Sequence, residues 1–190
     1  MIWSFVLLAP ICACYVLWEC GVVKNVAARD LMKDFVDISP AVILLAFNRP
    51  WAAVFLMLCL MANMFIYDNW VVGGVLFAAA YMTTSIFAAW FFPFDIMLVV
   101  FGLVLALGAA VPIAHACQGS ALFKVGLVFY SVLAIAPLTY AFAKTANLGF
   151  LFLILGDIGL GVYEICGAKW VKVAANILYF AGTCFVPLSL

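Results

Sequence analysis

Long apolar runs alternate with short polar or charged stretches along the whole chain. Most of these runs approach the roughly 20 residues that an α-helix needs to cross the hydrocarbon core of a bilayer. The pattern therefore predicts an all-α polytopic membrane protein with about eight transmembrane helices. The predicted spans cover residues 2–23, 38–47, 51–67, 70–90, 96–116, 122–143, 148–162 and 171–190.

The tryptophans and the basic residues support this topology. All six tryptophans lie near the ends of predicted spans, where an indole ring prefers the headgroup level. A charged amphipathic segment at residues 24–37 is expected to lie along the interface. The loops after the first, third, fifth and seventh spans carry six of the eight Lys and Arg residues. The positive-inside rule places these loops in the cytoplasm and both termini outside it.

A faint internal similarity relates the third predicted span to the seventh. It sets Ala62 and Asn63 opposite Gly156 and Asp157. Each repeat unit would hold four helices, and because four is even, the two units would cross the membrane in the same sense. This possible same-sense repeat differs from the inverted repeats of many transporters.

Composition restricts the classes of function. The chain is 71% hydrophobic and 8% charged, whereas soluble domains carry roughly 25% charged residues, so a soluble fold is excluded. The formal net charge is zero, which argues against a nucleic-acid partner and favours membrane lipid. We interpret residues 1–190 as a single transmembrane domain. Seven scattered cysteines without a C-x-x-C pair, and one histidine, predict neither a metal site nor another cofactor.

Asp157 is the most informative residue, because it interrupts an apolar span between GFLFLILG and IGLGV. A carboxylate in that position costs several kcal/mol unless it is paired, hydrated or protonated. A carboxylic acid that stays protonated near neutral pH is suited to general-acid catalysis. The alternative is an Asp that only forms hydrogen bonds with neighbouring helices.

Other polar side chains are expected at a similar depth. Asn63 and Asp157 both fall in the half of their spans nearer the cytoplasm, so they could face one cavity. Tyr179 and Thr183 are four residues apart and share a helical face on the last span. These residues predict a polar pocket that opens toward one set of headgroups. For each of them, an interhelical hydrogen bond is the structural alternative.

Several short motifs resemble the YhhN-like family of integral membrane lysoplasmalogenases. The similar segments include the opening MIWSF, the proline at position 40, WVVGGVLF at 70–77, Gly-Asp at 156–157 and Tyr-Phe-Ala-Gly at 179–182. The resemblance implies about eight helices and a hydrolase that cleaves the vinyl-ether bond of a lysoplasmalogen. The products would be a fatty aldehyde and a glycerophospho-alcohol.

The chain departs from the family pattern at several polar positions. The family usually has a second acid in a Gly-Asp pair on the third span, where this chain has Ala62 and Asn63. Tyr81 or its neighbour stands where a His is common, Ser39 replaces a Lys, and Thr183 replaces a Gln or His. Only Asp157 of the acid pair is present.

These observations favour a lysoplasmalogenase-like membrane hydrolase that acts on a single-chain ether phospholipid. Asp157 would be the general acid and Asn63 would orient water, while Tyr81, Tyr179 and Thr183 would line the substrate pocket. The alternative is a catalytically inactive relative that serves as a structural or lipid-binding subunit among other membrane subunits. A small transporter is a third possibility, but the sequence shows no paired intramembrane charges.

Overall fold

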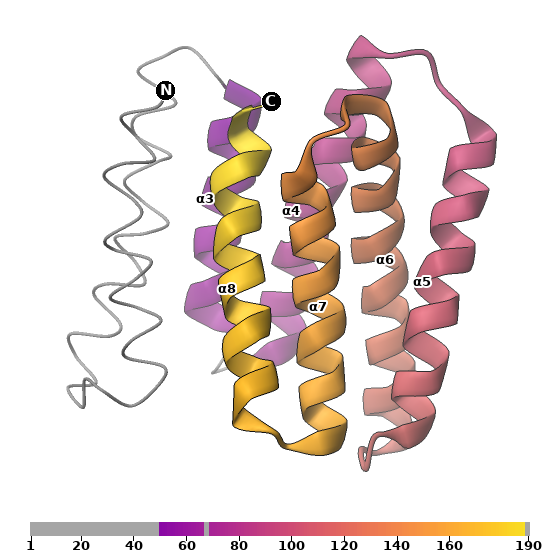
Figure 1. Ribbon diagram of the computed structural model, residues 1–190, viewed down its shortest axis with the longest axis vertical. Coiled ribbons are helices and arrows are strands. Elements are labelled where there is room, and N and C mark those ends of the chain that lie inside the picture. Colours follow the sequence, from indigo (N-terminus) through magenta and orange to yellow (C-terminus); the bar gives the residue numbers. More distant parts are fainter. Residues whose placement is uncertain (1–49, 67–68, 189–190) are drawn as a thin grey trace.

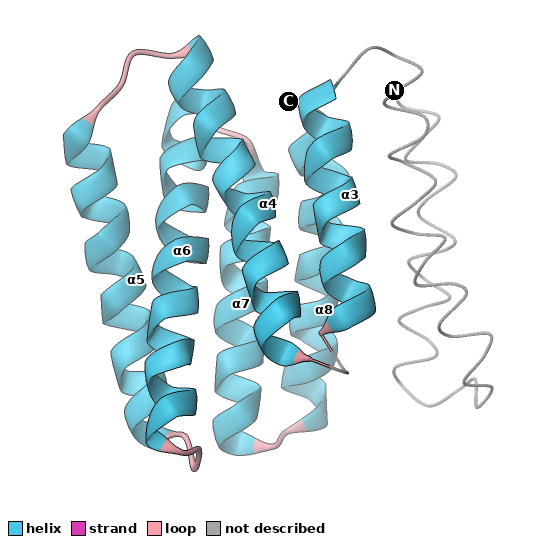
Figure 2. Cartoon of the chain, turned by 180° about the vertical axis from the view of Figure 1, so that it is seen from behind, coloured by secondary structure: helices cyan, strands magenta, loops and turns pink. Residues whose placement is uncertain are grey.

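The computed structural model describes residues 50–66 and 69–188. This part of the chain is helical, with short connecting loops (Figure 2). It contains α3 (Pro50–Phe65), α4 (Trp70–Phe91), α5 (Ile96–Ala116), α6 (Ala121–Thr145), α7 (Leu148–Cys166), α8 (Lys169–Phe185) and the 3₁₀ turn η1 (Val186–Leu188).

The expected helical, multi-pass membrane architecture is confirmed in part. Four helices, α4 to α7, are long and apolar enough to cross a membrane. The eight-span count is not supported, because the spans predicted at 2–23 and 38–47, and the segment 24–37, lie outside the described residues. In addition, α3 has 16 residues and α8 has 17, fewer than the 20 or so that a full crossing needs.

Short polar side chains fix where most of the helices begin. Asn69, Asp95, Ser120 and Asn147 each accept a hydrogen bond from a backbone N–H in the first turn of the helix that follows. Such caps satisfy donors that have no partner within the helix. At the end of α7, Gly167 adopts the left-handed conformation with φ 63°, which a glycine tolerates without strain.

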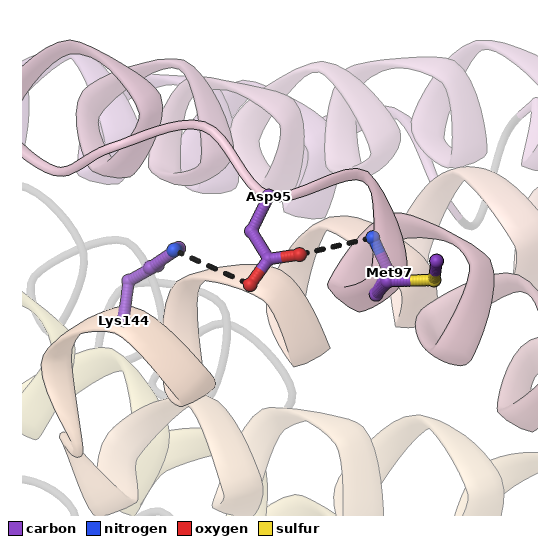
Figure 3. Close-up of polar contacts among 3 residues, drawn as sticks. All are labelled: Asp95, Met97 and Lys144. Atoms are coloured by element: carbon purple, nitrogen blue, oxygen red, sulfur yellow. Dashed lines mark hydrogen bonds and ion pairs between the residues drawn. The ribbon is translucent and has the colours of Figure 1, made fainter.

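Asp95 directly precedes α5, and its carboxylate makes two contacts. Its carboxylate accepts from the backbone N of Met97 at 3.0 Å and lies 3.8 Å from Nζ of Lys144 (Figure 3). The first contact caps α5, and the second ties the start of α5 to the end of α6. Asp95 therefore stabilises the end of the bundle that holds the α4–α5 and α6–α7 loops.

The helices form two layers around a shared interior. In Figure 1, α7 and α8 lie in front of α3 and α4, while α6 packs against both layers and α5 forms the outer edge. Successive helices alternate in direction, so α3 and α7 run the same way. The α3–α4, α5–α6 and α7–α8 connections gather at the lower end of this view.

Glycines allow α7 and α8 to approach closely. A Cβ atom on Gly156 would lie 3.1 Å from the carbonyl oxygen of Ala175 and 3.2 Å from the backbone N of Tyr179. On the other helix, a Cβ on Gly182 would lie 2.6 Å from Leu153 and 2.9 Å from the carbonyl of Gly149. Small residues commonly mark such tight contacts between membrane helices. The close packing fixes how Asp157, next to Gly156, is rotated toward the interior.

Candidate active site

A cavity of about 390 Å³ lies between the two helical layers. Residues of α3, α4, α6, α7 and α8 line it, and its volume is within the range of small-ligand sites. The exposed side chains of Trp70 and Glu164 line it near the α3–α4 and α7–α8 connections. The mouth therefore faces the end of the bundle that is drawn lowest in Figure 1.

Asp157 lies well inside this cavity. It precedes Glu164 by seven residues, which at 1.5 Å per residue places it about 10 Å further along α7 from the mouth. The hydroxyl of Tyr81 donates to its Oδ1 and the hydroxyl of Tyr130 donates to its Oδ2, each at 3.5 Å. These distances are well above the 2.7–2.8 Å typical of O–H···O bonds, so both carboxyl oxygens retain capacity for a closer partner.

No ion pair joins Asp157 to another of the residues 50–66 and 69–188. Lys172 lines the same cavity, near its mouth, and Asp95 pairs with Lys144 at the opposite end of the bundle. Asp157 is only partly exposed, and its accessible surface lines the cavity. The side chain thus has hydroxyl neighbours and open space beside it, and backbone amides do not cap it.

A second hydrogen-bonded pair lines the same cavity. Nδ2 of Asn63 donates to the hydroxyl of Tyr179 at 3.1 Å, joining α3 to α8. The ring of Phe77 lies between the two tyrosines, 6.1 Å from Tyr81 and 5.8 Å from Tyr179 between ring centroids. The Asn63–Tyr179 pair and the Asp157 carboxyl group therefore line one cavity, and aromatic rings make much of its remaining lining apolar.

The structure brings together four of the five residues selected from the sequence. Asn63, Tyr81, Asp157 and Tyr179 all line the cavity. Thr183 does not. It is buried one turn beyond Tyr179, and its hydroxyl donates to the carbonyl of Phe180 at 2.9 Å. A threonine in a helix satisfies its hydroxyl in this way without any ligand.

Tyr130, Glu164 and Lys172 also belong to the site, although the sequence analysis did not select them. Helical periodicity could have predicted that Glu164 and Lys172 lie on the same helical faces as residues of the site. Glu164 follows Asp157 by seven residues, and Lys172 precedes Tyr179 by seven, so each pair shares a helical face. Tyr130 carries no such signal, because it reaches Asp157 only through the packing of α6 against α7.

The available groups define the chemistry that this site supports. Two carboxyl groups, four tyrosine hydroxyls, two carboxamides and the ammonium group of Lys172 line a largely apolar space that opens toward one end of the bundle. In the described part of the chain, no three His, Cys, Asp or Glu side chains cluster as metal ligands. The site is therefore suited to proton transfer and to the positioning of water near an apolar ligand.

Comparisons with known proteins do not assign this fold or site. No protein-family model, curated protein or solved structure matches the chain. The class that the structure defines is a helical, multi-pass membrane protein with a polar cavity inside its bundle.

Proposed function

We propose that the chain is a lysoplasmalogenase-like membrane hydrolase, a divergent relative of the YhhN-like family. Its substrate would be a single-chain phospholipid with a vinyl-ether bond. One observation carries the proposal: Asp157 lines a cavity of about 390 Å³ and contacts two tyrosine hydroxyls there. An acid deep inside such a cavity, beside apolar side chains, can give a proton to a ligand that enters from the membrane.

The proposed topology has eight spans with both termini on the non-cytoplasmic side. Among the described residues, Lys124, Lys169 and Lys172 lie at the end of the bundle where the cavity opens, and Lys144 lies at the opposite end. This asymmetry favours a mouth at the cytoplasmic leaflet. A lipid in that leaflet would enter with its headgroup near Lys172 and Glu164 and its apolar part against Phe77 and Tyr81.

The proposed reaction begins with Asp157 in its protonated form. The acid gives its proton to the outer vinyl carbon, and the π electrons of the double bond form the new C–H bond. The ether oxygen shares a lone pair with the adjacent carbon, which leaves an oxocarbenium ion. The carboxylate of Asp157 is then the counter-ion of this cation, so one acid serves as proton donor and then as electrostatic stabiliser.

Water completes the cleavage and restores the acid. The water oxygen bonds to the cationic carbon, and the carboxylate of Asp157 accepts the proton that the water loses. The resulting hemiacetal transfers its hydroxyl proton to the glycerol oxygen as their C–O bond breaks, which releases a fatty aldehyde and a glycerophospho-alcohol. In this scheme the Asn63–Tyr179 pair orients the water and supplies no proton.

The second candidate function is a catalytically inactive lipid-binding or structural subunit of a membrane complex. The sequence resemblance favours this candidate, because it sets Asn63 where the family has its second acid. Nδ2 of Asn63 donates to the hydroxyl of Tyr179. Such a protein would bind a vinyl-ether lysophospholipid without cleaving it. It would also be recovered in a fixed ratio with other membrane subunits.

The deciding experiment measures aldehyde release from a vinyl-ether lysophospholipid by the purified full chain in lipid nanodiscs. We expect the Asp157→Asn variant to lose about 10²- to 10⁴-fold in rate, the usual contribution of a general acid. Asp95→Asn is the matched control, because Asn also caps a helix and Asp95 is not among the cavity-lining residues. Equal rates for Asp157→Asn and wild type would refute the catalytic role. Tight binding without turnover by the wild type would favour the inactive subunit.

A further inference from the structure

A second, smaller chamber lies on the other side of Asp157. It has a volume of about 30 Å³ and is lined by residues of α5, α6 and α7. Asp157, Tyr130, Leu127 and Gly161 line both this chamber and the large cavity, so they form the wall between the two spaces. The remaining lining residues are small or apolar, apart from Ser131.

The chamber has the size and the polar groups that water requires. A bound water needs roughly 10–15 Å³ and two to four polar partners, so about two waters fit. The hydroxyl of Ser131 donates to the carbonyl of Leu127 at 2.8 Å, which leaves its oxygen available as an acceptor. Tyr130 supplies a hydroxyl, and Asp157 supplies an oxygen whose direct contact is a long 3.5 Å. Burying a polar group in an apolar interior costs free energy unless the group forms hydrogen bonds, so these groups favour bound water.

We propose that this chamber binds water and supplies the water consumed when the vinyl ether is cleaved. This inference rests on the proposed function. A lipid that fills the large cavity excludes water from the mouth side, whereas water behind Asp157 and Tyr130 stays in place. The retained water passes the Asp157–Tyr130 wall, its oxygen bonds to the oxocarbenium carbon, and its proton goes to the Asp157 carboxylate. Tyr130 is accordingly a positioning residue of the wall.

Two variants and one matched control test the inference. Ala109→Leu adds apolar volume to a residue that lines only the small chamber. Ser131→Ala removes a polar partner without adding volume. Gly108→Leu is the control, because Gly108 is the neighbouring residue on α5 and a Cβ atom there meets nothing within 4 Å. Size-exclusion chromatography in detergent identifies the variants that retain the fold.

The first readout detects water directly and does not require activity. Hydroxyl-radical footprinting of the full chain in nanodiscs should oxidise Ile113, Ile135 and Ile158, which line the chamber but not the large cavity. We expect this labelling to fall in Ala109→Leu and to persist in Gly108→Leu. Labelling of Tyr163 in the large cavity should be unchanged in both variants. Absence of labelling at all three isoleucines in the wild type would refute a water-filled chamber.

The second readout is the kinetics of aldehyde release. We expect Ala109→Leu and Ser131→Ala to lower kcat by about tenfold with little change in KM, the loss expected when a water-mediated contact to the reacting group is removed. Gly108→Leu should match the wild type. Unchanged kcat in a variant whose chamber labelling is lost would refute the supply role. A wild type that labels at the isoleucines but cleaves no lipid would retain the water site and refute the proposed hydrolase.

Discussion

The two tyrosines that contact Asp157 should matter more in the transition state than in the resting site. Tyr81 is completely buried, and removing its hydroxyl leaves Asp157 with one of its two hydroxyl partners. Before proton transfer these contacts involve a neutral acid, for which a hydrogen bond contributes about 0.5–1.5 kcal/mol. After proton transfer they involve a carboxylate, for which it contributes about 1.5–3 kcal/mol.

The difference between these two values sets the expected effect of Tyr81→Phe. It is about 1–2 kcal/mol, and only interactions that strengthen in the transition state raise kcat. We therefore expect kcat to fall about 5- to 30-fold with KM nearly unchanged. Tyr130→Phe should behave similarly, and the double variant should lose more than either single variant. Initial rates of aldehyde release across a range of lysophospholipid concentrations separate the two constants.

Tyr140→Phe is the matched control for this experiment. Tyr140 is also a buried tyrosine of the bundle, but it is not among the residues that line either cavity. If Tyr81→Phe has the same kcat as the wild type while retaining its fold, the proposed contact between Tyr81 and the reacting acid plays no part in catalysis. A rise in KM alone would assign Tyr81 to lipid binding.

Two further variants test the packing. Gly156→Ala places a Cβ 3.1 Å from the carbonyl of Ala175. We therefore expect a lower Tm in detergent and a loss of about 1–3 kcal/mol in the free energy of unfolding. Gly108→Ala is the control and should not lower Tm, because a Cβ there meets nothing within 4 Å. An equal Tm for Gly156→Ala and wild type would contradict the close approach of α7 and α8. The hydroxyl of Tyr140 is buried without a hydrogen-bond partner in the part of the chain that the structure describes. Tyr140→Phe should thus be neutral or stabilising by up to about 1 kcal/mol in urea or thermal unfolding, and a clear loss would reveal a partner.

Within residues 50–66 and 69–188, local patterns were sufficient to predict where the long apolar helices α4 to α7 lie. The predicted span 96–116 coincides with α5, and 70–90 differs from α4 by one residue, because length and hydropathy act within each segment. The span 148–162 ends too early, since α7 continues to Cys166. Gly167, the left-handed residue that follows, marks this end and is itself a sequence signal for helix termination.

The contents of the site were less accessible to sequence reasoning. An acid inside an apolar span is unusual wherever it occurs, so Asp157 could be selected from its own helix. Its contact with Tyr130 depends on how α6 and α7 are rotated against each other, and no local pattern encodes that rotation. Ser85 illustrates the same limit. A serine inside a helix can form a hydrogen bond to its own helix backbone, but Ser85 donates to the carbonyl of Pro137 on α6 at 2.8 Å.

Thr183 shows that helical spacing alone can also select a residue that does not line the cavity. It shares a helical face with Tyr179, yet the cavity is lined by Tyr179 and not by Thr183. A shared face is therefore necessary for two residues to line one site, but the depth of the cavity decides which of them reach it.

Hydrolysis of a vinyl-ether lysophospholipid in D₂O by the full chain in nanodiscs shows whether Asp157 gives its proton to the vinyl carbon. If Asp157 protonates carbon, the released aldehyde carries one deuterium on the carbon next to its carbonyl, the reaction is slower than in H₂O, and Asp157→Asn yields almost none of this product. Aldehyde that lacks the deuterium, or labelled aldehyde formed equally fast by Asp157→Asn, would contradict the account.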